Sequence, residues 1–346
     1  MIGSLASTEP EDWFRPALAA SDEEAAALLR GPETLLVGFP LNIKSDFYGV
    51  LLVQESDQAI RFRERRVEII NSIAQQVALS IQNEHLQQEM VARERLEHEV
   101  VLARQIQMTF LPDHLPEFPN WDLAATWRTA REVGGDFYDV FELPGGRLGL
   151  FIADVSDKGI PAALFMSMTR TLVRAVVRDA ASPGEVMQRV NELIIPDNQQ
   201  DMFVTAVYGV LSLSEGSLIY ANCGHNPPFW RRCPDRHLEK LPRSGPALGV
   251  IPGAEYQERT LRLAPGDQLL LYTDGVTETF SPEGEPFGEA RLVQALQSAG
   301  DLTAGDLLEA VERAVDEFRG SLPATDDLTL LALRRMSGAP EGSGGS

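Results

Sequence analysis

The sequence predicts an α+β fold in which two antiparallel β-sheets are covered by helices on their outer faces. Two hairpins support this prediction: one joins the apolar runs 136–143 and 148–154 across a Pro-Gly-Gly turn, and the other joins 203–213 to 218–222. The other expected elements are helices at 160–177, 183–193, 288–297 and 304–318, and strands at 123–126, 229–231, 256–263, 268–273 and 328–334. This order is typical of antiparallel sheets that pack helices against one face.

Residues 1–83 precede this domain and form a segment of their own. We expect a short helix at 21–30 and strands at 34–39 and 47–53, followed by a long helix. A Pro-Leu pair at 40–41, a Tyr-Gly-Val-Leu run at 48–51 and a helical run at 74–83 resemble, in this order, the second half of a GAF sensory domain. The resemblance implies a partial GAF-like sensory segment. A small helix–strand cap without a sensory role is the alternative.

A long helix follows, because residues 61–110 contain neither glycine nor proline. Apolar residues first keep a heptad spacing, and three polar residues, Glu84, Gln88 and Arg95, then fall where further apolar residues belong. We therefore expect a helical, coiled-coil linker at 84–112 that forms a parallel homodimer with weak points in its seam. A single solvated helix packed on the following domain is the alternative.

Composition and charge limit the class of protein. The chain has 346 residues, of which 44% are hydrophobic, and its formal net charge of −21 argues against nonspecific binding to nucleic acid or acidic membranes. We expect Cys223 and Cys233 to be free thiols rather than a pair. The sequence has no apolar run of roughly 18 residues and no signal-peptide pattern, so we expect a cytoplasmic protein. The Gly/Ser-rich segment 337–346 is predicted to be a disordered tail.

Acidic residues stand at the ends of several predicted strands. The register of the first hairpin can bring Asp136 close to Asp154, while Asp274 ends a later strand and Asp326-Asp327 opens the last one. A single carboxylate at a sheet edge is usually a turn or cap residue. Several together repel each other and are costly to desolvate unless a cation joins them. Oxygen-only ligands favour a hard cation such as Mg²⁺ or Mn²⁺.

Five motifs in order point to a family. They are VGGDFYD at 133–139, ADVSDKG at 153–159, ANCGHNPP at 221–228, YTDGVTE at 272–278 and DDLT at 326–329. Together they resemble the SpoIIE/RsbU branch of the PPM metal-dependent protein phosphatases. The resemblance implies a catalytic domain at 113–336 with the PPM fold, an α-β-β-α sandwich of two antiparallel sheets flanked by helices.

The resemblance also implies a metal centre. Two ions, Mn²⁺ or Mg²⁺, would bind the substrate phosphate and hold a bridging water. By residue-for-residue likeness, Asp154 would bridge both ions, Asp274 and Asp326 would hold the first, and Asp136 with the backbone carbonyl of Val155 would hold the second. These four aspartates are the expected catalytic residues.

The resemblance also implies roles for the residues around these ligands. Asp326 is preferred over Asp327 as the ligand because the family's ligand precedes the start of the last strand. We expect Asp139 and Asp157 to give hydrogen-bonding support, although this branch usually has glycine at position 157. Larger eukaryotic relatives carry a histidine proton donor after the bridging aspartate. This sequence has none there, so we expect a metal-bound water to protonate the leaving oxygen, or Lys158 to help. His225 is expected to have a structural role in its turn, with a role near the substrate as the alternative.

The function implied is that of a protein serine/threonine phosphatase in bacterial signalling. Its implied partner is a phosphorylated STAS-domain protein, the antagonist of an anti-sigma factor, and regulation would come from the N-terminal segment and linker. No Cys-x5-Arg loop follows Cys223, so a cysteine mechanism is disfavoured. A catalytically weak module that binds phosphoproteins is the alternative. A nucleotide- or cofactor-using enzyme ranks lower, because no Walker loop or Gly-x-Gly-x-x-Gly run follows a strand.

Overall fold

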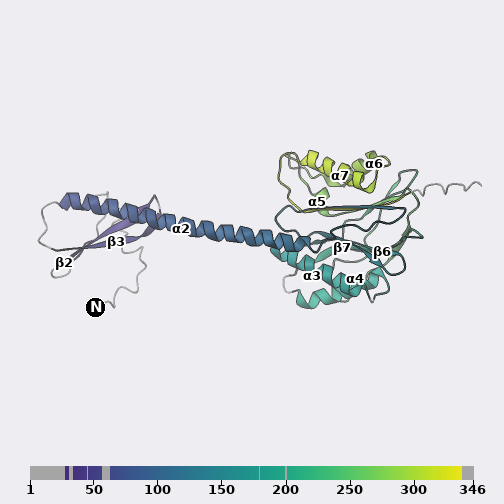
Figure 1. Cartoon of the computed structure of the whole chain (residues 1–346), viewed down its shortest axis with the longest axis horizontal. Helices are drawn as coiled ribbons and strands as arrows, with labels where there is room; N and C mark the ends of the chain where they lie inside the picture. Colours follow the sequence, from purple (N-terminus) through teal and green to yellow (C-terminus); the bar gives the residue numbers. More distant parts are fainter. Residues whose placement is uncertain are drawn as a thin grey trace, which may run out of the picture. The chain divides into compact units, whose positions relative to one another are not determined.

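The computed structural model describes residues 28–30, 34–44, 46–56, 63–178, 180–198 and 201–336 (Figure 1). The chain divides into two compact units, residues 1–97 and 98–346. Helix α2, Arg63–Met108, runs across the boundary between them. None of the described helices combines the length and the apolar character that a membrane span requires. The predicted tail at 337–346 lies outside the described residues.

The first unit is a three-stranded antiparallel sheet with the first part of α2. Its strands are β1 (Leu28–Arg30), β2 (Thr34–Ile43) and β3 (Asp46–Ser56), in the order β1-β2-β3. The small core of this unit packs Phe39 and Leu41 of β2 against Ala74 and Ala78 of α2. The strands predicted at 34–39 and 47–53 are therefore present, and the GAF-like interpretation stays a prediction.

The short helix predicted at 21–30 is wrong for its last three residues, and the rest of it lies outside the described residues. Residues Leu28–Arg30 form strand β1, which pairs antiparallel with β2. The local sequence pattern that predicts a helix does not decide the structure of these residues, because the edge of β2 offers backbone hydrogen bonds to any extended chain beside it.

The second unit contains two five-stranded sheets in which every strand pair is antiparallel. One sheet has the order β10-β9-β12-β13-β4, and the other has the order β11-β8-β7-β6-β5. The strands are β4 (Trp121–Arg128), β5 (Phe137–Leu143), β6 (Arg147–Val155), β7 (Val204–Ser212), β8 (Ser217–Cys223), β9 (Phe229–Arg231), β10 (Leu238–Lys240), β11 (Arg259–Arg262), β12 (Gln268–Tyr272) and β13 (Leu328–Arg335).

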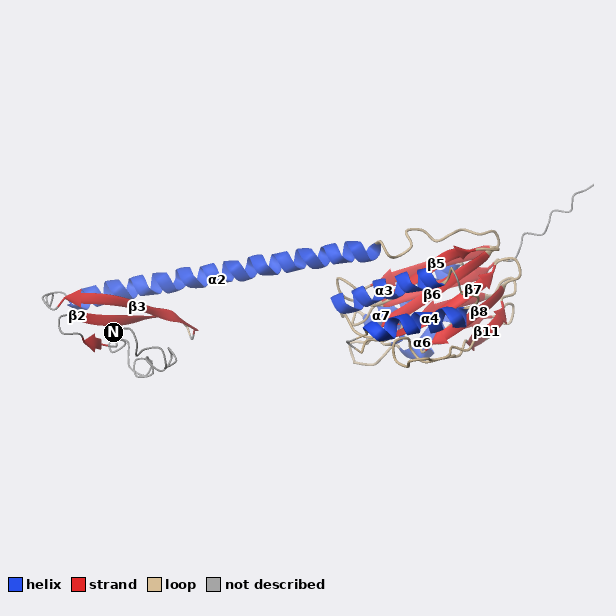
Figure 2. Cartoon of the chain, turned by 90° about the horizontal axis from the view of Figure 1, so that it is seen from below, coloured by secondary structure: helices blue, strands red, loops and turns tan. Residues whose placement is uncertain are grey.

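Helices cover the outer face of each sheet, so the second unit has four layers (Figures 1 and 2). Figure 2 shows α3 and α4 lying over the sheet that contains β5 to β8. The helices are α3 (Ile160–Val176), α4 (Pro183–Ile194), the 3₁₀ turn η2 (Ile195–Asp197), α5 (Asp274–Thr277), α6 (Gly288–Ser298) and α7 (Ala304–Arg319). The predicted α-β-β-α sandwich is confirmed.

Strand alternation explains the layers. Along β6, Leu148, Leu150 and Ile152 belong to the core between the two sheets, whereas Phe151 and Ala153 belong to the core under α3 and α4. Successive side chains of a strand point to opposite faces, so a strand covered on both sides must be apolar at every position. This double burial holds the ends of β6 in place, and Asp154 is near one of them.

Short elements were missed by the prediction. Strand β10 pairs with β9, and helix α5 is a single turn after β12. The strand predicted at 256–263 is present only as β11, Arg259–Arg262, beside β8. Elements of three or four residues have too few positions for a periodicity to be recognised. Whether they form depends on the segments that they pair with or pack against.

Candidate metal-dependent active site

Strand pairing brings the predicted carboxylates to one edge of the sandwich. The register of β5 and β6 places Asp136 beside Asp154. The register of β12 and β13 places Asp274, which follows β12, beside Asp326 and Asp327, which precede β13. The two pairs are close enough to interact, because the charges of both Asp274 and Asp326 raise the pKa of Asp154.

Burial and mutual repulsion make these carboxyl groups hard to ionise. Burial, followed by the charge of Asp274, raises the pKa of Asp154 to about 7. Burial, followed by the charge of Asp326, raises the pKa of Asp274 to about 6. Asp136 is 2% exposed, and burial together with the charge of Asp154 raises its pKa well above the usual value. A positive charge at this edge would stabilise all three carboxylates.

Two threonines fix the Asp136 side chain. Its Oδ2 atom accepts hydrogen bonds from Thr273 Oγ1 at 2.6 Å and from Thr329 Oγ1 at 2.9 Å. The indole Nε1 of Trp127 donates to the Asp136 backbone carbonyl at 2.8 Å. Because one oxygen is held by the threonines, the other oxygen of the carboxylate remains for a further partner.

The neighbouring residues Asp326 and Asp327 have different roles. Both oxygens of Asp327 accept backbone hydrogen bonds, from Ala130 N at 2.8 Å and from Gly135 N at 2.9 Å, so this side chain anchors the loop before β5. Asp326 Oδ2 instead lies 2.8 Å from Lys158 Nζ. Of the two, Asp326 has the oxygen that a cation already contacts, and it stays the predicted ligand.

The donor set fits a hard divalent cation. Four aspartates and a carbonyl offer oxygen atoms only, and the raised pKa values of three of the carboxyl groups indicate uncompensated negative charge. The Val155 carbonyl lies next to this cluster, since a Cβ atom on Gly135 would be 3.1 Å from its oxygen. Within the described residues, no three acidic, histidine or cysteine side chains form a ready cage for an ion. The carboxylates would therefore move together when an ion binds.

Comparison with known proteins identifies the family. The family model of stage II sporulation protein E (SpoIIE) matches residues 144–336. The chain belongs to the SpoIIE family. It is 34% identical over 265 residues to Protein IcfG of Synechocystis sp. (strain ATCC 27184 / PCC 6803 / Kazusa), an alignment that covers 68% of this chain and 41% of IcfG.

Two further relatives carry names that describe an activity. The chain is 27% identical to Phosphoserine phosphatase RsbU of Bacillus subtilis (strain 168), covering 70% of this chain and 72% of RsbU. It is 26% identical to Phosphoserine phosphatase RsbP of the same organism, covering 66% of this chain and 56% of RsbP. The alignments therefore cover less than two thirds of IcfG and of RsbP, and slightly more than two thirds of RsbU.

Solved structures agree on the fold. The SiaA-PP2C domain of Pseudomonas aeruginosa has a TM-score of 0.62 at 22% identity, covering 70% of this chain and 98% of that domain. The RsbU and RsbW domains of Rv1364c from Mycobacterium tuberculosis have a TM-score of 0.56 at 28% identity, covering 67% of this chain and 64% of that chain. The second unit of this SpoIIE-family chain therefore has the PP2C fold.

The loop after β6 carries Asp157 and Lys158. The φ angle of Asp157 is +139°, in the range that favours glycine, and its Oδ1 atom accepts a hydrogen bond from Lys158 N at 2.7 Å. Lys158 Nζ also donates to the Thr325 carbonyl at 2.9 Å. The loop therefore places the cationic side chain of Lys158 beside Asp326.

Asp139 has the supporting role expected for it. Its two carboxylate oxygens pair with Arg174 Nε and Nη2, both at 2.6 Å, and Arg170 Nε lies 3.1 Å from Oδ2. The side chain is 1% exposed, so these ion pairs satisfy a buried charge and attach β5 to α3.

His225 is buried in the turn between β8 and β9. Its Nδ1 atom lies 2.8 Å from Thr205 Oγ1, and its backbone N donates to Asn222 Oδ1 at 2.9 Å. Burial lowers the pKa of His225 to about 3, so the ring is neutral at physiological pH. These contacts favour the structural role over a role near the substrate.

Two supporting contacts were missed by sequence reasoning. The Gln107 side chain at the end of α2 hydrogen-bonds both backbone groups of Gly134, and the two threonines hold Asp136. Gly134 itself was a signal for close packing, because a Cβ atom there would lie 2.2 Å from Asp327 Oδ2. Which side chain fills that space is decided by residues far away in the sequence.

Proposed function

We propose that this chain is a metal-dependent protein serine/threonine phosphatase that hydrolyses phosphoserine or phosphothreonine. The observation that carries the proposal is the cluster of aspartates at one sandwich edge, whose pKa values are raised by burial and by each other. Similarity to RsbU and RsbP, which are named phosphoserine phosphatases, supports the substrate class.

Asp136, Asp154, Asp274, Asp326 and the Val155 carbonyl would hold two Mn²⁺ or Mg²⁺ ions. When bound, such ions supply a water of lowered pKa and positive charge for the phosphate oxygens. In the proposed roles, Asp154 serves both ions, Asp274 and Asp326 the first, and Asp136 with Val155 the second. These carboxylates are the catalytic residues of the proposal.

The remaining residues of the site position these groups. Thr273 and Thr329 orient the Asp136 carboxylate through its Oδ2 atom. Asp327 fixes the loop that leads into β5 by accepting two backbone hydrogen bonds. Lys158, 43% exposed in its side chain, is a cationic donor at the mouth of the site, where it can contact a phosphate oxygen or the leaving oxygen of the substrate.

The decisive experiment is hydrolysis of para-nitrophenyl phosphate with and without Mn²⁺, followed by a phosphoserine protein. Phosphatase function predicts turnover that requires the metal and prefers the phosphoserine protein to a phosphodiester or a nucleotide. A phosphoprotein-binding module predicts binding of the phosphorylated protein with no metal-dependent turnover. Turnover that is indifferent to Mn²⁺ and to chelation would reject the proposal.

The proposed physiological substrate is a phosphorylated STAS-domain protein, the antagonist of an anti-sigma factor. A protein substrate suits a site that opens at a sheet edge and a chain whose net charge of −21 disfavours free polyanions. The comparison to make is dephosphorylation of candidate STAS proteins against an unrelated phosphoserine protein of similar size. Equal rates on both would show that the STAS fold is not recognised.

Regulation by the N-terminal segment and a homodimeric linker completes the proposal. Helix α2 exposes a series of apolar side chains beyond the small first-unit core, including Leu86, Met90, Val91 and Leu96, which are 48–64% exposed. Apolar side chains along a helix favour pairing with a second helix. A monomeric full chain in light scattering would remove the dimer from the proposal.

A further inference from the structure

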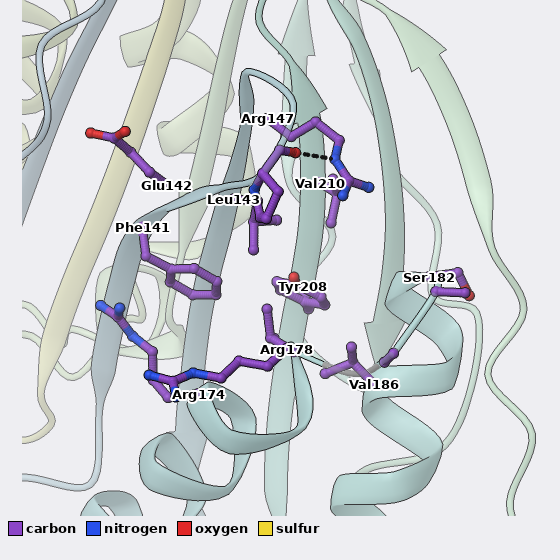
Figure 3. A pocket seen from close by; sticks show the side chains of 14 residues that line it. Phe141, Glu142, Leu143, Arg147, Arg174, Arg178, Ser182, Val186, Tyr208 and Val210 are labelled. Atoms are coloured by element: carbon purple, nitrogen blue, oxygen red, sulfur yellow. Dashed lines mark hydrogen bonds between the residues drawn. The ribbon is translucent and has the colours of Figure 1, made fainter.

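A pocket lies at the opposite end of strands β5 and β6 from the carboxylates. It has a volume of about 460 Å³ and is enclosed by the sheet and by helices α3 and α4 (Figure 3). Its walls include Leu143 at the end of β5 and Arg147 at the start of β6. Asp136 and Asp154 stand at the opposite ends of these two strands, so the pocket is separate from the candidate active site.

The pocket is cationic in a strongly acidic chain. Arg147, Arg174 and Arg178 line it. Among the lining residues that the structure describes, the acidic one is Glu142, whose carboxylate points away from the arginines in Figure 3. The chain as a whole has a net charge of −21. A local excess of arginine against such a background attracts anions into the pocket.

Two of the three arginines have donors to spare. Arg174 is committed to Asp139 through two hydrogen bonds. Arg147 donates its Nε to the Pro144 carbonyl at 2.9 Å, and no ion pair joins its guanidinium to a described carboxylate. Arg178 forms no hydrogen bond or ion pair with any of the described residues. The fixed fork of a guanidinium matches the oxygens of a phosphate.

Two hydroxyl groups add neutral donors. Tyr208 is 1% exposed and lines the pocket, yet its hydroxyl takes part in none of the hydrogen bonds among the described residues. Burial raises the pKa of Tyr208, so the group keeps its proton and can donate it. Ser182 caps α4, a helix of 12 residues, without a capping hydrogen bond from its side chain. Both groups are available to a ligand.

The acidic residue in the first turn of α4 does not neutralise the arginines. Glu185 accepts a hydrogen bond from Ala181 N at 2.7 Å and pairs with Arg189 on its own helix. The remaining walls of the pocket are apolar, with Phe141, Val177 and Val210 among them. A ligand that fills this space needs an anionic group at one end and an apolar or aromatic body at the other.

We propose that this pocket is a binding site for a small organic phosphate, whose phosphate group is held by Arg147 and Tyr208, which interact across the pocket, while Arg178 contacts another part of the ligand. Phosphate is preferred over carboxylate because two of its oxygens can accept from the fork of one guanidinium group while a third accepts from the Tyr208 hydroxyl. The proposal does not depend on the phosphatase function, because the pocket shares no residue with the carboxylate cluster.

The test uses the full chain with EDTA present, so that no metal ion at the aspartates binds phosphate. Isothermal titration with adenosine diphosphate, glucose 6-phosphate and inorganic phosphate should give binding of at least one organic phosphate with a Kd below about 1 mM, and weaker binding of inorganic phosphate. Replacing both arginines, in R147Q/R178Q, should weaken that binding at least about tenfold, the range that lost charge-assisted hydrogen bonds produce.

Matched controls separate the pocket from general charge effects. R259Q/R262Q removes the same charge from the exposed edge strand β11 and should leave binding unchanged, as should Asp154→Asn. Arg178→Gln alone, at an exposed position, serves if the double variant is unfolded by circular dichroism. The proposal fails if no organic phosphate binds, if a dicarboxylate such as malonate binds more tightly than every phosphate, or if R259Q/R262Q weakens binding as much as the pocket variant.

Discussion

Gln107 and Gly134 exchange two hydrogen bonds. The side-chain Nε2 atom donates to the Gly134 carbonyl at 2.5 Å, and the Gly134 amide donates to Oε1 at 3.1 Å. Gly134 lies two residues before Asp136, and Gln107 is 2% exposed at the end of α2. The last turn of the long helix is therefore attached directly to the loop that carries a predicted metal ligand.

Replacing Gln107 by alanine should destabilise the protein and weaken metal binding. The substitution leaves a buried amide and a buried carbonyl without partners, which costs about 1–3 kcal/mol. Urea unfolding measures the stability, and a Mn²⁺ titration of turnover measures the metal affinity. Gln105→Ala, at an exposed position two residues earlier on the same helix, is the control. If both variants behave alike, the contact with Gly134 has no role in the site.

Asp154→Asn should abolish Mn²⁺-dependent turnover while the fold survives. The amide keeps the shape of the side chain and removes the charge that an ion needs. In the metal-free protein the variant should melt at a higher temperature, because a buried charge beside Asp136 and Asp274 is gone. Mn²⁺ at a hundred times its Kd stabilises the folded protein by about 2.7 kcal/mol.

Differential scanning calorimetry with and without Mn²⁺ separates the two effects for Asp154→Asn. The wild-type protein should gain melting temperature with the ion, and the variant should gain much less. Glu142→Gln, an exposed carboxylate at the other end of the same sheet, should behave as wild type. Retention of most turnover by both Asp154→Asn and Asp274→Asn would reject a metal mechanism at these residues.

Lys158→Gln should strengthen Mn²⁺ binding. The ion pair between Lys158 Nζ and Asp326 Oδ2 competes with a metal for that oxygen. Both side chains are partly exposed, so the pair contributes at most about 1 kcal/mol and the gain in affinity should be no more than about fivefold. Calorimetric titration of Mn²⁺ tests this, with Lys158→Arg as the variant that keeps the charge. A loss of affinity in Lys158→Gln would indicate that Lys158 helps to assemble the site.

His225 should make folding stability fall in mildly acidic solution. The pKa of its buried ring is about 3 in the folded protein, whereas an unfolded histidine titrates near about 6.5. Between these values the unfolded chain binds more protons, so this residue lowers the free energy of unfolding as the pH decreases through about 6.5. The charged group facing the ring is Arg243, which lowers the pKa further, beside the backbone of Thr205 and Tyr272.

The comparison for His225 is with His225→Asn, which has no titrating ring. The difference in unfolding free energy between wild type and variant should shrink by roughly 1.4 kcal/mol for each pH unit below about 6.5, a slope set by one proton. Urea unfolding at several pH values measures it, and the contributions of the carboxylates cancel in the difference because both proteins contain them. A constant difference across this range would mean that the ring is protonated or accessible in the folded state.

Filling the polar positions of the linker seam should lock one packing of α2. The variant replaces Glu84, Gln88 and Arg95 by leucine, which makes the seam apolar throughout. A bias of a few kcal/mol is enough to shift the equilibrium between two packings of similar energy. We expect kcat to change by about an order of magnitude or more in one direction. Steady-state turnover and light scattering are the measurements. A dimer with unchanged turnover and metal affinity would make the helix a passive tether.

Local patterns predicted the parts of the fold whose signals are local. Alternation along β5 and β6 and the Pro-Gly-Gly turn between them are short-range, so the hairpin that places Asp136 beside Asp154 was expected. The long helix was expected from the absence of glycine and proline at 61–110. Helix α5 was not expected, because its single turn is too short for a helical periodicity of apolar residues to be recognised.

Support for the site could not be predicted, because it joins distant parts of the chain. Asp136 receives hydrogen bonds from Thr273 and Thr329, which lie 137 and 193 residues further along the sequence. Nothing in the residues around position 136 indicates which side chains will meet it after folding. The same holds for the Gln107–Gly134 contact, which joins helix α2 to the loop before β5 across 27 residues.

Asp327 occupies the space between two glycines. A Cβ atom on Gly134 would lie 2.2 Å from its carboxylate, and one on Gly275 would lie 1.8 Å from its backbone carbonyl. Gly134 therefore cannot gain a side chain while the Asp327 carboxylate stays where it is. At Gly275 the close atom belongs to the backbone, so no substitution at position 327 makes room there. In natural variants of this chain, a larger residue at position 134 should occur only where position 327 has become smaller, so drift at one position is visible as drift at the other.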